Sequence, residues 1–282
     1  MARPDIRLHL IGGVWAAVVS FGAMAQGALL AYEGFDYPND GPEIHGRNGG
    51  VGWTAAWDEG ANADFAHLTQ DDVSLNVASF PFAPAGDRIQ GAGGVATRPL
   101  PFTFDTSTDG VLYASYLMRK DVDSDAVTTA ENVEISLNAS ATNTQVLRVG
   151  SNSLRSFFLA RNTATQALPN GSLTLGDTYF IVMKIESFAS SPDVFSAQIY
   201  DAADASPTAE PATWDLQATT ATNFLIDTLR LQIGANTAGG IDEIRFGSSF
   251  AAVAMVPECS TFALSLITLS VAGGTLRRRF TR

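Results

Sequence analysis

Residues 132–138 read Asn-Val-Glu-Ile-Ser-Leu-Asn, so polar and apolar side chains alternate through the whole segment. Successive side chains of a β-strand point to opposite faces of the sheet. The pattern therefore predicts a strand with one apolar and one polar face. Residues 228–233, Thr-Leu-Arg-Leu-Gln-Ile, repeat the alternation. Both segments are typical of half-buried antiparallel strands.

Working outward from these two segments, the rest of the middle region is also rich in β-forming residues. Turn-forming sequences such as 108–110, Thr-Asp-Gly, and 169–171, Pro-Asn-Gly, separate the candidate strands. The sequence shows no long amphipathic helix and no strand-helix alternation, which favours a two-sheet antiparallel β-sandwich over an α/β fold. The further strands expected are 111–119, 144–149, 155–161, 178–186, 193–200 and 241–247.

The first 25 residues have the features of a secretory signal peptide. Arg3 and Arg7 precede an apolar run over residues 10–23, and Ala23 and Ala25 have the spacing of small residues at a signal peptidase site. A membrane-spanning first helix is the alternative, but the apolar run is shorter than the roughly 20 residues that a span needs. We predict an N-terminal signal helix and cleavage after Ala25.

The tail, residues 254–282, has the features of a membrane anchor. Its apolar segment, 262–276, is followed by Arg277, Arg278 and Arg279. Basic residues at the end of such a segment favour the cytoplasmic side of a membrane. A buried core helix is the alternative, which three consecutive arginines after an uncharged run disfavour. The tail is therefore predicted to form a hydrophobic helix that anchors the chain at least transiently.

The start of this tail carries a second signal. Val256, Pro257, Glu258 and Cys259 precede the apolar segment and the closing arginines. This three-part order resembles the PEP-CTERM sorting signal, with Cys259 where that family usually has proline. The resemblance implies processing by an exosortase-like enzyme in the envelope or extracellular matrix of a Gram-negative-type bacterium. The alternative is that the tail remains as an uncleaved anchor.

The middle region, residues 26–253, is long enough for one large core and is predicted to be a single domain. From residue 26 to residue 256, 11 Lys and Arg residues stand against 27 Asp and Glu residues, a net charge of −16. Such an acidic surface repels nucleic acid, which is therefore not an expected partner. The single cysteine, Cys259, lies in the tail, so the domain has no disulfide and depends on its apolar core.

The two ends of this domain carry a second resemblance. Residues 30–37 read Leu-Ala-Tyr-Glu-Gly-Phe-Asp-Tyr, residues 49–53 read Gly-Gly-Val-Gly-Trp and precede Trp57, and residues 241–247 read Ile-Asp-Glu-Ile-Arg-Phe-Gly. These segments look like those of concanavalin A-like (LamG-like) jelly-roll domains. The resemblance implies that the first and last strands are neighbours, and that the domain binds glycans or serves as a structural module.

Catalytic patterns are weak in this domain. Glycosidases use two carboxylates that flank the scissile bond, and laminarinase-like relatives place them as Glu-x-Asp-x-x-Glu, which this sequence lacks. Glu131 and Glu134 are three positions apart, and Asp242 and Glu243 are adjacent. In a regular strand each of these pairs faces opposite sides. The sequence predicts a non-catalytic protein, with a glycosidase or lyase as the alternative.

Two pairs of residues are candidates for a metal ion or a ligand. Asp36 and Asp242 would approach each other if the first and last strands pair, and they could then share a structural calcium ion, which prefers oxygen ligands. Trp53 and Trp57 are candidate stacking platforms for sugar rings. The alternative for the tryptophans is core packing under a long loop.

Together these features predict three segments: a signal peptide at 1–25, a β-sandwich domain at 26–253 and a sorting and anchor tail at 254–282. We expect an exported, envelope-sorted, non-catalytic protein that binds polysaccharide or is a structural component of the cell surface. Its expected partners are the secretion machinery, an exosortase-like enzyme, a polysaccharide and the membrane. A glycan-active enzyme on a jelly-roll scaffold is the alternative.

Overall fold

The computed structural model describes residues 27–38, 43–60, 68–71, 73–75, 77, 79–80, 86–123, 131–142, 144–161 and 164–254. Within these residues the chain forms fourteen strands, one 3-10 turn and one short α-helix. No helix in the described ranges is long and apolar enough to cross a membrane. The expected signal helix and C-terminal helix lie outside the described residues, as do the processing and sorting residues Ala23, Ala25, Val256, Pro257, Glu258, Cys259, Arg277, Arg278 and Arg279.

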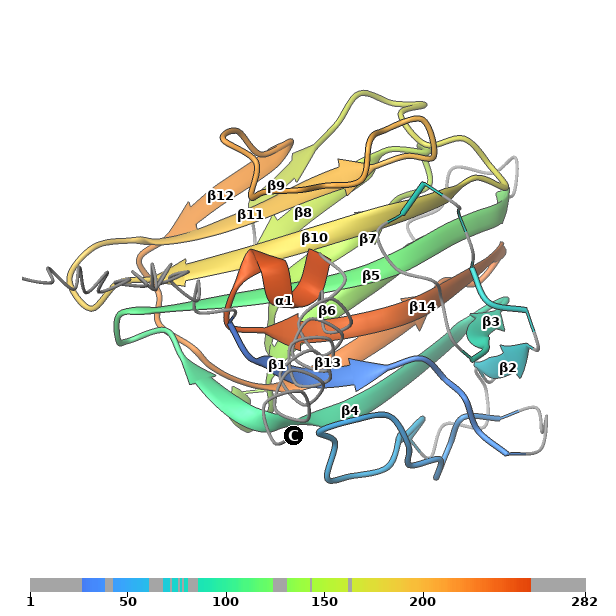
Figure 1. Cartoon of the computed structure of the whole chain (residues 1–282), viewed down its shortest axis with the longest axis horizontal. Helices are drawn as coiled ribbons and strands as arrows, with labels where there is room; N and C mark the ends of the chain where they lie inside the picture. The colour runs from blue at the N-terminus through green and yellow to red at the C-terminus, as the bar shows by residue number, and fades with distance from the viewer. Residues whose placement is uncertain are drawn as a thin grey trace, which may run out of the picture.

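Eight of the described strands form the larger of two antiparallel sheets (Figure 1). The first strand pairs with the last, with Glu33 opposite Ile244, as the jelly-roll resemblance implied. In spatial order the larger sheet consists of β12 (Leu216–Thr220), β11 (Asp193–Tyr200), β10 (Thr178–Ser187), β5 (Gly110–Asp123), β14 (Thr237–Gly247), β3 (Arg88–Gly91) and β2 (Thr69–Asp71), with β1 (Leu29–Glu33) also paired to β14.

Six described strands form the smaller sheet, which is antiparallel throughout. Its edge strand contains Pro99 and Pro101. Proline has no backbone N–H to donate to a sheet ladder, so it is tolerated at a sheet edge. In spatial order the sheet consists of β4 (Gly94–Asp105), β13 (Leu225–Ile233), β6 (Val133–Ala139), β7 (Thr144–Ser151), β8 (Phe157–Arg161) and β9 (Ala164–Ala167), with the 3-10 turn η1 (Ser140–Thr142) between β6 and β7.

The two sheets enclose one apolar core. Leu229 and Leu231 of β13 and Ile135 and Leu137 of β6 belong to it and are almost completely buried. These are apolar residues whose alternation predicted the two strands. The prediction of an all-β, two-sheet antiparallel sandwich is confirmed.

A second apolar cluster covers part of the outer face of the larger sheet. The short helix α1 (Phe250–Ala254) lies in front of β5 and β14 (Figure 1), and the rings of Phe250 and Tyr113 meet edge to face with centroids 6.4 Å apart. Phe80 packs against Phe180 of β10 at 5.7 Å. Because β10 is covered on both faces there, it is continuously apolar from Tyr179 to Met183, as is usual for doubly buried strands.

A bulge in β14 overturns one expectation about the acidic residues. The pairing of β14 with β5 shifts register between Asp242 and Arg245, and Glu243 has a φ of 53°. Ile241 and Ile244 both face the core although they are three positions apart. The bulge therefore leaves the two residues between them, Asp242 and Glu243, on the outer side of the sheet. The expectation that Asp242 and Glu243 face opposite sides is therefore wrong, because it assumed an unbroken strand.

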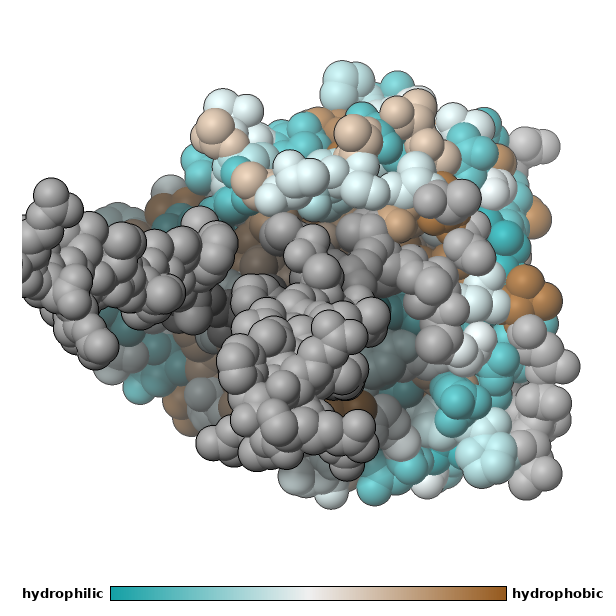
Figure 2. Space-filling view, viewed as in Figure 1, coloured by the Kyte–Doolittle hydropathy of each residue, from teal (hydrophilic) through white to brown (hydrophobic). Residues whose placement is uncertain are grey.

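The described surface is mixed in polarity. On the face shown in Figure 2, hydrophobic residues are scattered among hydrophilic and intermediate ones. The large apolar side chains that are exposed include Val51, Val73 and Val111. Scattered apolar residues of this kind are ordinary on a protein surface.

Candidate functional site

The smaller sheet carries polar side chains on the face turned away from the core. Core residues of β13 and β6 alternate with residues that point outward. The pairing register places Arg230 of β13, Ser136 of β6 and Arg148 of β7 side by side. We call these three residues the arginine row. Neighbouring strands are about 4.8 Å apart, so the two arginines start from backbone positions roughly 10 Å apart.

Glu134 lies two residues before Ser136 on the same face of β6, and its carboxylate faces both arginines. Arg148 donates two hydrogen bonds to it, from Nε to Oε1 at 3.0 Å and from Nη2 to Oε2 at 2.7 Å. Arg230 Nη1 lies 3.6 Å from Oε1, which is an ion pair without a hydrogen bond. The Glu134 side chain is fully buried, whereas the Arg148 side chain is 34% exposed and that of Arg230 18%. One carboxylate thus faces two guanidinium groups, and positive charge is in excess.

Strand β6 is buried on both faces, although its alternation predicted a half-buried strand. Glu134 and Ser136 are fully buried and Asn138 nearly so, because long side chains of β7 and β13 lie beside them. Buried polar atoms usually have a hydrogen-bond partner. Within the described residues, Ser136 Oγ, Asn138 Oδ1 and Arg230 Nη1 have none. This face therefore has unused hydrogen-bonding groups next to exposed arginine surface.

The surroundings of Arg230 disfavour its charge. Burial lowers the pKa of the guanidinium from its usual value; Glu134 opposes this effect, and the neighbouring Arg148 charge adds to it. The side chain of Arg230 donates no hydrogen bond to any residue of the described ranges. A buried charge normally has both an ionic partner and hydrogen bonds. Arg230 shares its ionic partner with Arg148, and it has no hydrogen bond to any residue that the structure describes.

The polar face continues on both sides of the arginine row. Phe158 of β8 lies opposite Gly150, and the Arg148 guanidinium carbon is 5.4 Å from its ring centroid. Gln232 of β13 lies opposite Glu134, and its Nε2 donates to Asn132 Oδ1 at 3.3 Å. Guanidinium, amide and hydroxyl groups thus lie together beside the Phe158 ring. Ligand sites commonly combine apolar lining with a few placed polar groups in this way.

The candidate sugar platforms Trp53 and Trp57 lie against Arg98. The guanidinium carbon of Arg98 is 4.5 Å from the Trp53 ring centroid and 5.3 Å from that of Trp57. Trp57 is 1% exposed and stacks on Phe35 with centroids 5.9 Å apart. Trp53 is partly buried against the core. Because Trp57 is enclosed, the structure favours the packing alternative for Trp57, and a ligand role of Trp53 stays a prediction.

Arg98 and Glu33 form a buried ion pair that links the start of the domain to β4. Glu33 also accepts hydrogen bonds from the Phe35 backbone N–H and the Tyr37 hydroxyl, both at 2.8 Å. Arg98 Nε donates to the Ala55 carbonyl at 2.7 Å. The residues that carry the jelly-roll resemblance at 30–37 thus build a structural cluster.

The structure does not arrange Asp36 and Asp242 as a shared calcium site. Asp36 follows β1 and is exposed, whereas Asp242 is fully buried. Asp242 Oδ2 accepts hydrogen bonds from Ser74 Oγ at 2.6 Å and from the Leu75 backbone N–H at 2.9 Å, so this oxygen already has partners. Within the described residues, no group of three or more His, Cys, Asp or Glu side chains could hold a metal ion.

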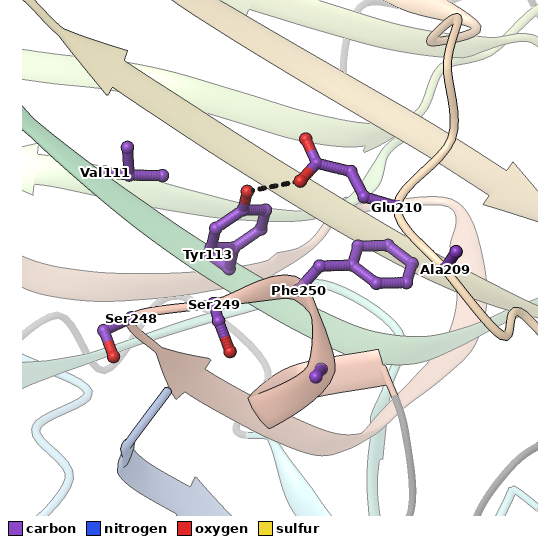
Figure 3. Close-up of a pocket in the computed structure, with 8 residues that line it drawn as sticks. Val111, Tyr113, Ala209, Glu210, Ser248, Ser249 and Phe250 are labelled. Carbon is purple, nitrogen blue, oxygen red and sulfur yellow. Dashed lines mark hydrogen bonds between the residues drawn. The ribbon is translucent and has the colours of Figure 1, made fainter. Parts of the chain in front are cut away.

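A pocket of about 330 Å³ lies on the outer face of the larger sheet, between β5 and α1 (Figure 3). The Tyr113 hydroxyl donates to Glu210 at 2.7 Å, and Lys184 Nζ donates to the same carboxylate at 2.6 Å. Burial and the contact with Glu210 raise the pKa of Tyr113 to about 12, so its hydroxyl stays protonated. The carboxylate is already paired, and the pocket is a weaker candidate than the arginine row.

The sequence patterns did not single out Arg148 or Arg230 as site residues. Each appears as one polar residue within an expected strand. They become neighbours because β6 lies between β7 and β13, and β13 comes from nearly 100 residues further along the chain. The only available signal was that each arginine occupies an outward position in an alternating or apolar segment.

No protein-family model matches this sequence, and no curated protein is similar to it at a significant level. Among solved structures, a protein of unknown function from Shewanella oneidensis MR-1 is 12% identical, with a TM-score of 0.43 over 79% of this chain and 87% of that one. An endo-β-1,4-glucuronan lyase from the fungus Trichoderma reesei is 11% identical, with a TM-score of 0.37 over 70% and 96%. Lectin II from Ulex europaeus is 7% identical, with a TM-score of 0.38 over 66% and 93%. At these values the similarities carry no argument about the ligand or activity of this chain.

Proposed function

We propose that this chain is an exported, non-catalytic protein of the concanavalin A-like jelly-roll type, and that it binds polysaccharide on the outer face of the smaller sheet. The observation that carries the proposal is a group of three buried polar atoms on this face, Ser136 Oγ, Asn138 Oδ1 and Arg230 Nη1, that have no hydrogen-bond partner among the residues that the structure describes. A sugar hydroxyl both donates and accepts hydrogen bonds, so one ligand class suits all three atoms. Leaving such atoms unpaired costs about 1–3 kcal/mol each, which binding would recover in part.

The export part of the proposal rests on the two ends of the sequence. The basic and apolar N-terminal segment with Ala23 and Ala25 supports cleavage by signal peptidase. The Val256-Pro257-Glu258 motif, the apolar segment and the closing arginines support sorting by an exosortase-like enzyme. A cell-surface or matrix location would bring the domain into contact with polysaccharide.

The pairing of the carboxylates on the smaller sheet favours binding over hydrolysis. Glu134 is held by two arginines. Another carboxylate of this sheet, Asp227, accepts hydrogen bonds from the backbone N–H and the hydroxyl of Ser140. Glycosidases need two carboxyl groups that flank the scissile bond, one to donate a proton and one to attack or to activate water. The enzyme alternative would need a different pair.

The binding face can be tested with two matched glutamine variants. Gln232 lies on the proposed face, and Gln217 lies exposed on β12 of the larger sheet; each donates one long side-chain hydrogen bond. Polysaccharides retained by the wild-type protein are first identified by affinity gel electrophoresis. Gln232→Leu should then weaken retention roughly threefold to tenfold, the range for a lost neutral hydrogen bond, while Gln217→Leu should not. Equal effects of both variants, or no retained polysaccharide, would reject the proposal.

A further inference from the structure

The charge balance of the arginine row points to a ligand class. Glu134 is fully buried and is held by two hydrogen bonds from Arg148, so it cannot turn fully toward Arg230. Arg230 therefore has one ionic contact at 3.6 Å and no hydrogen bond within the described part of the chain. The hydroxyl of Ser136, between the two arginines, also has no partner there. The missing component is an acceptor that carries negative charge.

We infer that the arginine row binds an oxyanion carried on a polysaccharide, with Arg230 and the exposed part of Arg148 as the two cationic contacts. The Arg230 guanidinium would donate to the oxyanion, and Ser136 would donate its hydroxyl hydrogen. Guanidinium groups suit oxyanions because their N–H donors match the two oxygens of a carboxylate or sulfate. This inference rests on the proposed function and narrows it from polysaccharide in general to acidic polysaccharide.

The acidic surface of the domain does not prevent this binding. The net charge of −16 between residues 26 and 256 repels a polyanion at long range. At 0.15 M ionic strength, however, charges further apart than about 8 Å are largely screened. Contacts within hydrogen-bond distance of Arg230 and Arg148 then dominate. Because the rest of the surface is acidic, polyanions should not bind nonspecifically elsewhere on the protein. The arginine row is therefore a local site.

A carboxylate and a sulfate offer the same chemistry to the arginines, so the experiment must separate them. Affinity electrophoresis at 0.15 M salt with chelator present would compare polygalacturonate, dextran sulfate and neutral dextran. The chelator removes divalent cations that would bridge an acidic protein to an acidic polymer. Retention by polygalacturonate alone would identify the carboxylate, and retention by both charged polymers would identify an oxyanion of either kind.

Arg230→Gln and Arg119→Gln form the matched pair for this test. Both remove one positive charge, but Arg119 lies on the larger sheet and pairs with Asp121. Arg230→Gln should preserve folding, because Arg148 continues to hold Glu134; a urea unfolding curve of each variant checks this. We expect Arg230→Gln to weaken retention by the charged polymer at least about tenfold, as for a lost charge-assisted hydrogen bond. Arg119→Gln should leave it unchanged.

Three outcomes would overturn the inference. Equal retention by dextran and the charged polymers would reject the acidic ligand but leave polysaccharide binding intact. Equal effects of Arg230→Gln and Arg119→Gln would show that only net charge matters. If no polymer, charged or neutral, is retained, the proposed function itself fails together with the inference.

Discussion

At the residue scale, two arginines of this fold show what a buried guanidinium requires. Arg98 is fully buried but contacts the Glu33 carboxylate, the Ala55 carbonyl and two tryptophan rings. Arg230 is less buried but donates no hydrogen bond to another described residue. The contacts of Arg98 satisfy its charge and its hydrogen-bond donors, so we assign Arg98 a structural role. Arg230 has an ionic contact with Glu134 but no hydrogen bond within the described residues, which is why we assign it to a ligand.

Arg98→Met should strongly destabilise the domain. The substitution leaves Glu33 buried, where it keeps hydrogen bonds from Phe35 and Tyr37 but loses its counter-charge. Breaking a buried ion pair by removing one partner typically costs about 3–5 kcal/mol. Urea unfolding followed by tryptophan fluorescence measures the loss. The double variant Glu33→Gln with Arg98→Met should recover part of it, and a double variant as unstable as the sum of the single ones would contradict the pairing.

Asp242 should make stability depend on pH. Burial is the main reason that its pKa is raised, to about 8 from 3.8. Between these values the folded protein holds a proton that the unfolded chain releases. The free energy of unfolding should therefore fall as pH rises through this window, by up to about 1.4 kcal/mol per pH unit, and level off above pH 8.

Unfolding curves at pH 5, 6.5 and 8 can isolate this contribution. Asp242→Asn should flatten the decline, because the ionising group is gone. Asp105→Asn is the control: this carboxylate is exposed and hydrogen bonds from Ser107 lower its pKa, so its contribution changes only below about pH 4. A wild-type slope that survives in Asp242→Asn would show that another group is responsible.

At the element scale, the sequence predicted strands where alternation or apolar runs are long and missed them elsewhere. The expected strands at 111–119, 132–138 and 178–186 correspond to β5, β6 and β10. Strand β4 was missed because Pro99 and Pro101 interrupt its pattern, and only its edge position makes them tolerable. The bulge at Glu243 was equally invisible, because it depends on pairing with β5. Predicting the arginine row from the sequence would have required the same information, namely which strands are neighbours in the sheet.

Gly150 allows β7 to lie close to β6 at this site. A Cβ atom on Gly150 would be 2.1 Å from the Val133 carbonyl oxygen and 2.6 Å from the Glu134 Cα, both backbone atoms that cannot give way locally. Gly150→Ala should therefore cost about 1–3 kcal/mol through overpacking. It should also weaken polysaccharide retention, because β6 carries Glu134 and Ser136.

Gly110→Ala is the matched control for this substitution. The nearest neighbours of a Cβ atom on Gly110 would be side-chain atoms, the Ser187 Oγ at 3.2 Å and the Phe104 ring at 3.3 Å. We expect a loss of less than about 1 kcal/mol and unchanged retention, because these side chains can shift. Urea unfolding and affinity electrophoresis of both variants provide the comparison. Similar losses in the two variants would show that the close approach of β7 to β6 is unimportant.

At the scale of the whole molecule, the two ends of the described sandwich meet. Leu29 of β1 pairs with Gly247 of β14, and the Ala28 N–H donates to Ser248 Oγ at 2.9 Å. The segments predicted to direct export and sorting therefore leave the domain from neighbouring points. Their removal would break none of the strand ladders described here. The sandwich should be an independent folding unit, and export should be a property of the segments that flank it.

A fragment of residues 27–254 should therefore fold cooperatively, whereas a fragment of residues 34–254 should not reach the same stability. The shorter fragment lacks β1, so it loses four paired positions on β14 and the Glu33 carboxylate that neutralises Arg98. An unpaired buried arginine alone costs several kcal/mol. Urea unfolding monitored by tryptophan fluorescence reports on both fragments, because Trp53 and Trp57 lie against Arg98. Equal unfolding midpoints would mean that the pairing of β1 with β14 does not close the sandwich.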